Sequence, residues 1–289
     1  MSRFRVYLNM GTIADLPEGS MLPKLEGADL YTYLQAAGFE GLQGGDPVLC
    51  RELGLGCAGG GRVDRPEDAW SIAHRDQAAG FEHTTLHVGT GLETDAEMDE
   101  LVQAVVAASR ETGYPLSIET HRATITQDLR RLVDMVARNP DVRINGDFSH
   151  LYTGQEMVYG DFEGKLDLLE GVFERVRFMH GRIGSPGCIQ VDIGEGVSPC
   201  LQQTGPRDFL SDFREIWTRA MAGFLRHADD SETLIFAPEI LMPSIYYVRC
   251  FQTPDGRLDE ECDRYQQALV YARIARECFA SAEARLSFA

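Results

Sequence analysis

Short apolar runs alternate with amphipathic segments about eight times along the chain, and this alternation limits the fold more than any other feature. The apolar runs look like strands of a parallel sheet that is covered on both faces. The clearest amphipathic segment begins at the capping-box pair Thr94 and Glu97 and continues with Met98, Leu101 and Val102 on one helical face. The repeated strand–helix unit predicts an α/β protein built around a parallel sheet.

The expected elements can be placed from this pattern. Strands are expected at residues 4–10, 39–43, 55–60, 83–88, 116–119, 142–147, 176–180 and 233–239. Helices are expected at residues 28–37, 47–53, 66–79, 94–112, 125–136, 166–173, 210–224 and 259–282.

The number of units and the length of the chain indicate a closed barrel. Eight strand–helix units in 289 residues predict a (β/α)8 TIM barrel, a fold that typically has ~250 residues. No linker or change of composition marks a second domain, so we expect one domain over residues 1–289, with the helix at 259–282 closing the barrel or packing on it. An open doubly wound sheet is the alternative. Two long loops, 181–206 and 242–258, are expected to serve as lids or oligomer contacts.

Four of the expected strands end in side chains that can bind a metal ion, namely Glu119, Asp147, His180 and Glu239. In a barrel the carboxyl ends of all strands open onto one face, so these side chains should converge. Three carboxylates and one imidazole suit Mn²⁺ or Mg²⁺, with Co²⁺ or Zn²⁺ as alternatives. Polar residues also follow strands simply to cap helices or to face water, and for any single residue this interpretation stands beside the functional one.

Charge and cysteine content restrict the partners of the protein. The net charge is −18, from 45 acidic and 27 basic residues, and it repels a phosphate backbone, so we expect no nucleic-acid partner. No apolar run is long enough to span a bilayer, so we expect no membrane partner. Met1 to Arg5 lack a long apolar segment, so no signal peptide is expected. Seven cysteines without a C-x-x-C pair fit a reduced, cytoplasmic chain better than a disulfide framework.

The strand-exit pattern resembles the sugar phosphate isomerase/epimerase family of xylose isomerase-like TIM barrels over residues 4–239. In that family the fifth strand ends in a metal-binding Glu, the sixth carries an Asp-x-x-His pair, the seventh ends in His and the eighth in Glu. These positions fall on Glu119, Asp147, His150, His180 and Glu239. The run His180-Gly-Arg-Ile-Gly, with Gln190 downstream, is similar to a His-x-Arg-x-Gly stretch followed by Gln-Val in some members.

The resemblance implies a metal-dependent isomerase or epimerase of a small sugar or polyhydroxy carbonyl compound. It implies a cation that chelates the substrate and stabilises the enediolate left by proton abstraction. Glu119 and Glu239 then act as the acid/base pair as well as ligands, and His150, Arg182 and Gln190 contact the substrate. Family members are often dimers or tetramers, so the resemblance also implies a homo-oligomer.

Further polar residues at strand exits have two interpretations each. His87 ends the fourth expected strand and is either a substrate contact or a packed core histidine. His121 follows Glu119 by two positions and either turns into the site or begins the next helix. Asn9 and Gln43 end the first two strands and either line the pocket or only cap loops.

Several other activities are compatible with the same residues. A metal-dependent lyase on this scaffold, inosose dehydratase-like or glycoside-cleaving, would start from the same enolate. The endonuclease branch of the superfamily needs more histidine and carboxylate ligands and a basic groove, which seven histidines and a charge of −18 disfavour. A non-catalytic binding barrel would keep its function after loss of Glu119 and Glu239. No glycine-rich phosphate loop stands out, which favours an unphosphorylated substrate.

Overall fold

Eight parallel strands pair with their neighbours in chain order and close into a barrel, because the first strand pairs with both the second and the eighth. The structure is a computed structural model that describes residues 3–198 and 207–287. The strands are β1 (Phe4–Asn9), β2 (Gly41–Gln43), β3 (Gly56–Val63), β4 (His83–Val88), β5 (Leu116–Glu119), β6 (Ile144–Asn145), β7 (Val176–Gly181) and β8 (Leu234–Pro238). The predicted (β/α)8 barrel is therefore confirmed.

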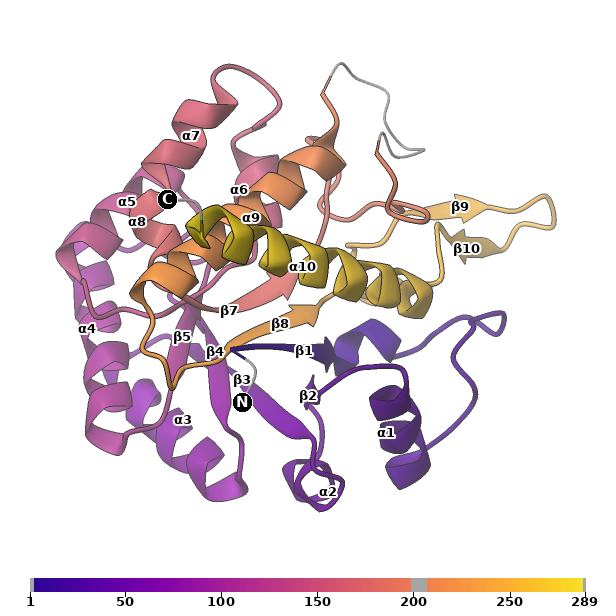
Figure 1. The fold of residues 1–289 in the computed structure, drawn as a ribbon, viewed down its shortest axis with the longest axis horizontal. Coiled ribbons are helices and arrows are strands. Elements are labelled where there is room, and N and C mark those ends of the chain that lie inside the picture. The colour runs from indigo at the N-terminus through magenta and orange to yellow at the C-terminus, as the bar shows by residue number, and fades with distance from the viewer. Residues whose placement is uncertain (1–2, 199–206, 288–289) are drawn as a thin grey trace.

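Helices surround the barrel (Figure 1). They are α1 (Gly27–Ala36), α2 (Pro47–Glu52), α3 (Pro66–Ala79), α4 (Asp95–Thr112), α5 (Leu129–Arg138), α6 (Phe148–Gly154), α7 (Phe162–Leu168), α8 (Glu170–Phe173), α9 (Phe209–His227) and α10 (Arg264–Ser287). Two 3₁₀ helices follow strands β1 and β8, η1 (Met10–Ile13) and η2 (Pro243–Ile245). The last helix, α10, lies along α9 and also contacts β8 and β1.

Local signals in the sequence account for the helix ends. The predicted capping box at the start of α4 is present, with the Glu97 carboxylate accepting from Thr94 N at 2.8 Å and the Thr94 hydroxyl accepting from Glu97 N. Such a cap typically contributes about 1 kcal/mol. Gly113 ends the same helix in the left-handed conformation, at φ 67°, where a side chain would be strained.

A small cluster of buried side chains fills the barrel below its mouth. It comprises Tyr7, Ala58, Phe178, Ile235 and Ala237. The Tyr7 ring lies over two glycines of the neighbouring strands, because a Cβ built on Gly41 would stand 2.5 Å from Tyr7 Cζ and one on Gly56 would stand 1.8 Å from Tyr7 Oη. These glycines therefore leave the space that the ring occupies.

His83 enters the barrel at the beginning of β4 and is 6% exposed. Its Nε2 lies 2.9 Å from Ser117 Oγ on β5, and its ring centroid lies 5.3 Å from that of Phe178. Burial, with a smaller contribution from the positive charge of Arg143, lowers the pKa of His83 to about 3. The imidazole is therefore packed in its neutral form.

Several expected segments differ from the structure. The helix expected at 125–136 begins at Leu129, and the helix expected at 166–173 is two helices, α7 and α8. The sixth strand was expected at 142–147, but only Ile144–Asn145 is strand, because Asp147 accepts a hydrogen bond from Ser149 N at 3.1 Å and starts α6. The expected helix start at residue 259 is wrong: β9 (Cys250–Gln252) and β10 (Leu258–Glu260) form a hairpin that extends past the expected 242–258 loop, and the helix begins at Arg264. The hairpin extends away from the barrel at the right of Figure 1.

The structure also bears on the cysteines and on membrane segments. The six cysteines within the described residues are all free, and Cys200, like the end of the expected 181–206 loop, lies outside them. Within residues 3–198 and 207–287, no helix has the length and apolar character needed to cross a membrane.

Replacing Gly56 with alanine should destabilise the protein, because the new methyl group would overlap the Tyr7 hydroxyl. We expect a loss of about 1–3 kcal/mol in the free energy of unfolding, measured by urea denaturation. Gly60 on the same strand is the control, since a Cβ there meets nothing within 4 Å. Equal stability of the Gly56→Ala and Gly60→Ala variants would contradict the role assigned to Tyr7.

The neutral burial of His83 should make the protein less stable in acid. The unfolded chain takes up the histidine proton near pH ~6.5 but the folded chain only near pH 3, so the unfolding free energy falls as pH drops through this window. From pH 6.5 to pH 5 the loss should be about 2 kcal/mol. Denaturation of a His83→Gln variant at several pH values should lack this slope, whereas His74→Gln, an exposed change on α3, should keep it.

Candidate metal-binding and active site

The structure brings the four predicted metal ligands together at the carboxyl ends of the strands. Glu119, Asp147, His180 and Glu239 each offer one ligand atom, and these atoms all lie within 4.8 Å of one another. Glu119 ends β5, Asp147 begins α6 just after β6, His180 lies near the end of β7, and Glu239 directly follows β8. Glu119, Asp147 and His180 are buried, and Glu239 is partly exposed.

Asp147 provides the test of whether these donors fit a cation. Its Oδ1 accepts hydrogen bonds from the backbone N of Ser149 at 3.1 Å and from the Ser149 hydroxyl at 2.5 Å. Its Oδ2 is buried and has no hydrogen-bond partner in the described part of the chain, although Arg182 Nη2 and His150 Nε2 each stand 3.4 Å away, within ion-pair range. A buried carboxylate oxygen held only by such long contacts, with ligand atoms of two further carboxylates within 4.8 Å, is suited to a hard divalent cation. The donor set therefore fits such an ion.

Positive side chains partly balance this negative charge. Burial opposes ionisation of Glu119 and Asp147, but His180 and His87 lower the pKa of Glu119, and Arg182 and His150 lower the pKa of Asp147. Burial also opposes the charged form of His180, yet Glu239 and Glu119 outweigh it and raise the pKa of His180 to about 9. Because a metal-binding histidine must be neutral, cation binding at His180 releases a proton.

Arg182 is the permanent positive charge of the site. The side chain is fully buried, its Nη2 contacts a carboxylate oxygen of Glu239, and the same atom lies 3.4 Å from Asp147 Oδ2. Its guanidinium carbon stands 4.5 Å from the centre of the Tyr247 ring. Within the described residues Nε and Nη1 have no hydrogen-bond partner, so two donors are available to an oxygen-rich ligand.

A layer of amides orients the charged side chains. Asn9 donates to Glu239 Oε1 at 2.9 Å and to Gln43 Oε1 at 3.1 Å, and it also caps η1. Gln43 Oε1 accepts from His180 Nε2 at 2.9 Å, which leaves His180 Nδ1 facing the carboxylates. Both interpretations of Asn9 thus apply at once, since it lines the pocket and caps a loop.

Two polar residues of this site were not predicted from the sequence. Asn145 donates to Glu119 Oε2 at 3.3 Å, and Thr85 accepts from Gln43 Nε2 at 2.9 Å. Asn145 lies two positions before Asp147, and Thr85 lies two positions before His87. Because residues two apart in a strand face the same side, this spacing is the signal that could have identified them.

A cavity of about 580 Å³ lies beside the candidate ligands. Its lining includes Glu119, His180, Glu239, Asn9, Gln43 and His87. His87 therefore lines the cavity and does not lie in the packed core, and its role as a substrate contact stays a prediction. The size is within the usual ~300–1,000 Å³ of small-molecule sites.

The predicted substrate contacts are placed differently from one another. His121 turns toward the site and begins no helix; its ring centroid lies 4.3 Å from that of His87 and 3.9 Å from that of His150. His150 is buried, and neither ring nitrogen has a hydrogen-bond partner in the described ranges.

Gln190 does not join this group, because both its amide atoms bond the backbone of Leu241, at 3.1 and 2.8 Å. These two hydrogen bonds connect the loop after β7 to the loop after β8.

Comparison with solved structures gives a shared fold. No protein-family model and no curated protein matches the chain. Among solved structures, a xylose isomerase-like TIM barrel protein from Mycobacterium smegmatis in complex with magnesium matches with a TM-score of 0.54 at 12% identity, covering 96% of this chain and 98% of that one. A sugar phosphate isomerase/epimerase from Parabacteroides distasonis matches with a TM-score of 0.54 at 11% identity, covering 98% and 96%.

A third match is a probable 3-DHS dehydratase involved in petrobactin synthesis from Bacillus anthracis. Its TM-score is 0.54 at 15% identity, covering 84% of this chain and 94% of that one. The chain therefore has the fold of the xylose isomerase-like TIM barrels, and the resemblance found in the sequence is confirmed at the level of the fold.

Removing the charge of Arg182 should destabilise the protein, because Asp147 and Glu239 would lose their buried counter-charge. We expect Arg182→Met to lose about 3–5 kcal/mol of unfolding free energy in the presence of a chelator, measured by urea denaturation. Arg130→Met breaks an exposed ion pair with Asp134 and should change stability by less than about 1 kcal/mol. An unchanged free energy of unfolding in Arg182→Met would show that another group compensates the negative charge of the carboxylates.

Proposed function

We propose that this protein is a divalent-metal-dependent isomerase or epimerase of a small sugar or other polyhydroxy carbonyl compound. The observation that carries the proposal is the convergence of three carboxylates and one imidazole within 4.8 Å, next to a cavity of about 580 Å³ at the barrel mouth. Active sites of such barrels lie at this face. The named isomerase/epimerase and dehydratase among the structural matches support an enzymatic role for the scaffold.

The residues proposed to hold the cation are Glu119, Asp147, His180 and Glu239. Their oxygen-rich donor set favours Mn²⁺ or Mg²⁺ over Co²⁺ or Zn²⁺. The magnesium in the matched Mycobacterium smegmatis barrel supports a hard cation on this scaffold. When bound, a divalent cation supplies Lewis-acid polarisation of a substrate carbonyl.

Proton transfer is assigned to the two glutamates. Both line the cavity, and they come from strands that β6 and β7 separate, so they can approach a bound substrate from different sides. One carboxylate removes the proton next to the carbonyl and the other returns a proton, with the hydrogen bond from Asn9 orienting Glu239. Positioned proton transfer of this kind typically contributes ~10²–10⁴-fold to the rate.

Two further residues are proposed to bind substrate oxygens. Arg182 has free donors at Nε and Nη1 and places a permanent positive charge where negative charge develops on the substrate. The two ring nitrogens of His150 are buried without a hydrogen-bond partner among the described residues. Nε2 stands 3.4 Å from Asp147 Oδ2, so a substrate hydroxyl would bind at Nδ1. His87 lines the cavity and serves as a further contact, whereas Gln190 is assigned to holding the loops.

A lyase is the second candidate, because one structural match at the same TM-score is a probable dehydratase. The first step, proton abstraction by one of the glutamates, is shared. The reactions diverge when a neighbouring group leaves with its electron pair instead of a proton being returned to the carbon. The products therefore distinguish the two candidates.

We also propose a small-molecule substrate as the partner, without nucleic acid or membrane, and a cytoplasmic homo-oligomer. The charge of −18 and the free cysteines support this environment. The hairpin region supports self-association, because Tyr246, Phe251 and Leu258 are large, apolar and exposed there.

Metal analysis and solvent deuterium incorporation into a panel of ketoses and keto-cyclitols test the proposed function. We expect Mn²⁺-dependent exchange of the proton next to the carbonyl, and Glu119→Gln or Glu239→Gln should lower its rate at least ~10²-fold. Glu67→Gln, an exposed change on α3, is the control. Product analysis by NMR separates stereochemical exchange from loss of water or another group. Retained exchange in both glutamate variants would overturn the assignment.

A further inference from the structure

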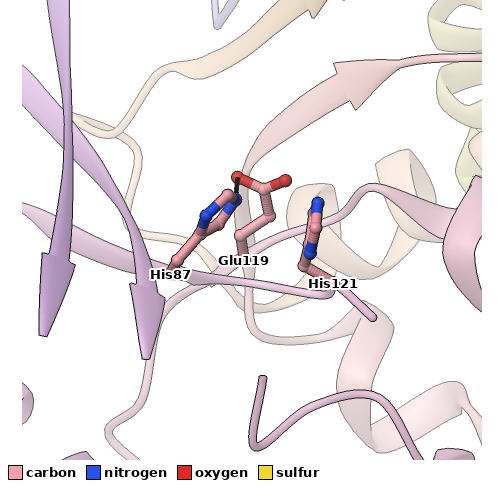
Figure 2. Close-up of side chains that lie close together, drawn as sticks. All are labelled: His87, Glu119 and His121. Carbon is pink, nitrogen blue, oxygen red and sulfur yellow. Dashed lines mark ion pairs between the residues drawn. The ribbon is translucent and has the colours of Figure 1, made fainter. Parts of the chain in front are cut away.

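A second group of possible metal ligands lies beside the first. His87, Glu119 and His121 each offer one ligand atom, and these atoms all lie within 4.8 Å of one another. Figure 2 shows the Glu119 carboxylate between the two imidazole rings. The trio shares only Glu119 with the four-residue cluster described above. It comes from the ends of β4 and β5, next to the cavity.

The carboxylate of Glu119 faces both groups at once. Its Oε1 lies 3.3 Å from His180 Nδ1, on the side of the first cluster. Its Oε2 lies 3.4 Å from His87 Nε2, on the side of the second. A carboxylate whose two oxygens face different imidazoles has the arrangement needed to bridge two cations, which in two-metal sites lie ~3.5–4 Å apart.

The hydrogen bonds of His121 determine which nitrogen can bind a metal. Nδ1 lies 2.5 Å from the carbonyl oxygen of Arg122, so this nitrogen carries the proton and donates it. Nε2 lies 3.2 Å from the Tyr247 hydroxyl and accepts from it. Metal-binding histidines typically donate their other ring N–H to a carbonyl or carboxylate in this way. Nε2 is thus the unprotonated nitrogen, and an ion that binds it would take the place of the Tyr247 hydroxyl.

The backbone after β5 is shaped to hold His121 in this position. Thr126 Oγ1 accepts from His121 N at 2.9 Å and donates to the Glu119 carbonyl at 2.7 Å. Ala123 takes a left-handed conformation at φ 55°, which is costly for a residue with a Cβ. Strained residues of this kind persist only where the surrounding structure holds them, and they concentrate at functional sites.

We propose that His87, His121 and Glu119 bind a second divalent cation, of the Zn²⁺ or Co²⁺ kind, with Glu119 bridging it to the first. Two imidazoles and one carboxylate form a softer donor set than the three carboxylates and one imidazole of the first cluster, so the two positions should differ in the ions they select. The proposal goes beyond the proposed isomerase or epimerase, whose chemistry requires one cation only.

Metal stoichiometry tests the proposal without reference to catalysis. The full chain is freed of metal and dialysed against Mg²⁺ or Co²⁺ alone, and bound metal is measured by mass spectrometry. We expect one equivalent of Mg²⁺ and two of Co²⁺ in the natural protein. His87→Asn and His121→Asn should each bind one equivalent of each ion, with loss of part of the Co²⁺ visible absorption. His74→Asn, exposed on α3, is the matched control and should keep two of Co²⁺.

The outcomes distinguish this proposal from the proposed function. One equivalent of Co²⁺ in the natural protein, or two in both histidine variants, overturns the second site. Asp147→Asn changes the first cluster only, so it should remove the Mg²⁺ and leave one Co²⁺. Absence of Mg²⁺ and Mn²⁺ from the natural protein counts against the proposed function, while two Co²⁺ that depend on His87 and His121 still support the second site. Circular dichroism of each variant checks that it is folded.

Discussion

Negative charge concentrated at the mouth of the barrel is the constraint on which the rest of the site depends. Three carboxylates have ligand atoms within 4.8 Å of one another, and Glu119 and Asp147 are almost fully buried. Two like charges about 4 Å apart repel by roughly 4 kcal/mol at the effective dielectric constant of a protein surface. Arg182 and protonated His180 oppose this repulsion, and a bound cation would complete the balance.

The side chains inside the barrel form layers, and an apolar layer lies directly below the charged side chains of the site. Tyr7 and Phe178 form an apolar level, and Asn9 and His180, two positions further along the same strands, belong to the polar level above it. The period of two in a strand produces this layering, because every second side chain points inward. At the apolar level Gly56 leaves room for the Tyr7 ring.

Much of the candidate site could be predicted, since its ligands are the last side chains of apolar runs and parallel strands end on one face. Asn145 and Thr85 were missed because an amide or hydroxyl within a strand indicates nothing by its type; only its spacing of two from Asp147 or His87 marks it as inward-facing. Gln190 was expected at the substrate, but its side chain bonds Leu241, a contact between two loops that lie 51 positions apart. Loop-to-loop contacts of this range leave no periodic pattern in a sequence.

The sequence by itself determined the strand–helix order, because this order follows from local periodicity. It also placed Glu119, Asp147, His180 and Glu239 at strand ends, which share one face when the strands are parallel. Pairing of β1 with β8 decided in the tertiary structure that the sheet is closed and not open. Only the tertiary structure decided that β6 shortens to Ile144–Asn145, that a β9–β10 hairpin interrupts the last loop, and that His121 folds back toward His87. The physical reason is that capping by Asp147, hairpin pairing and the turn at Ala123 depend on side chains and backbone brought together by folding, which hydrophobic periodicity does not record.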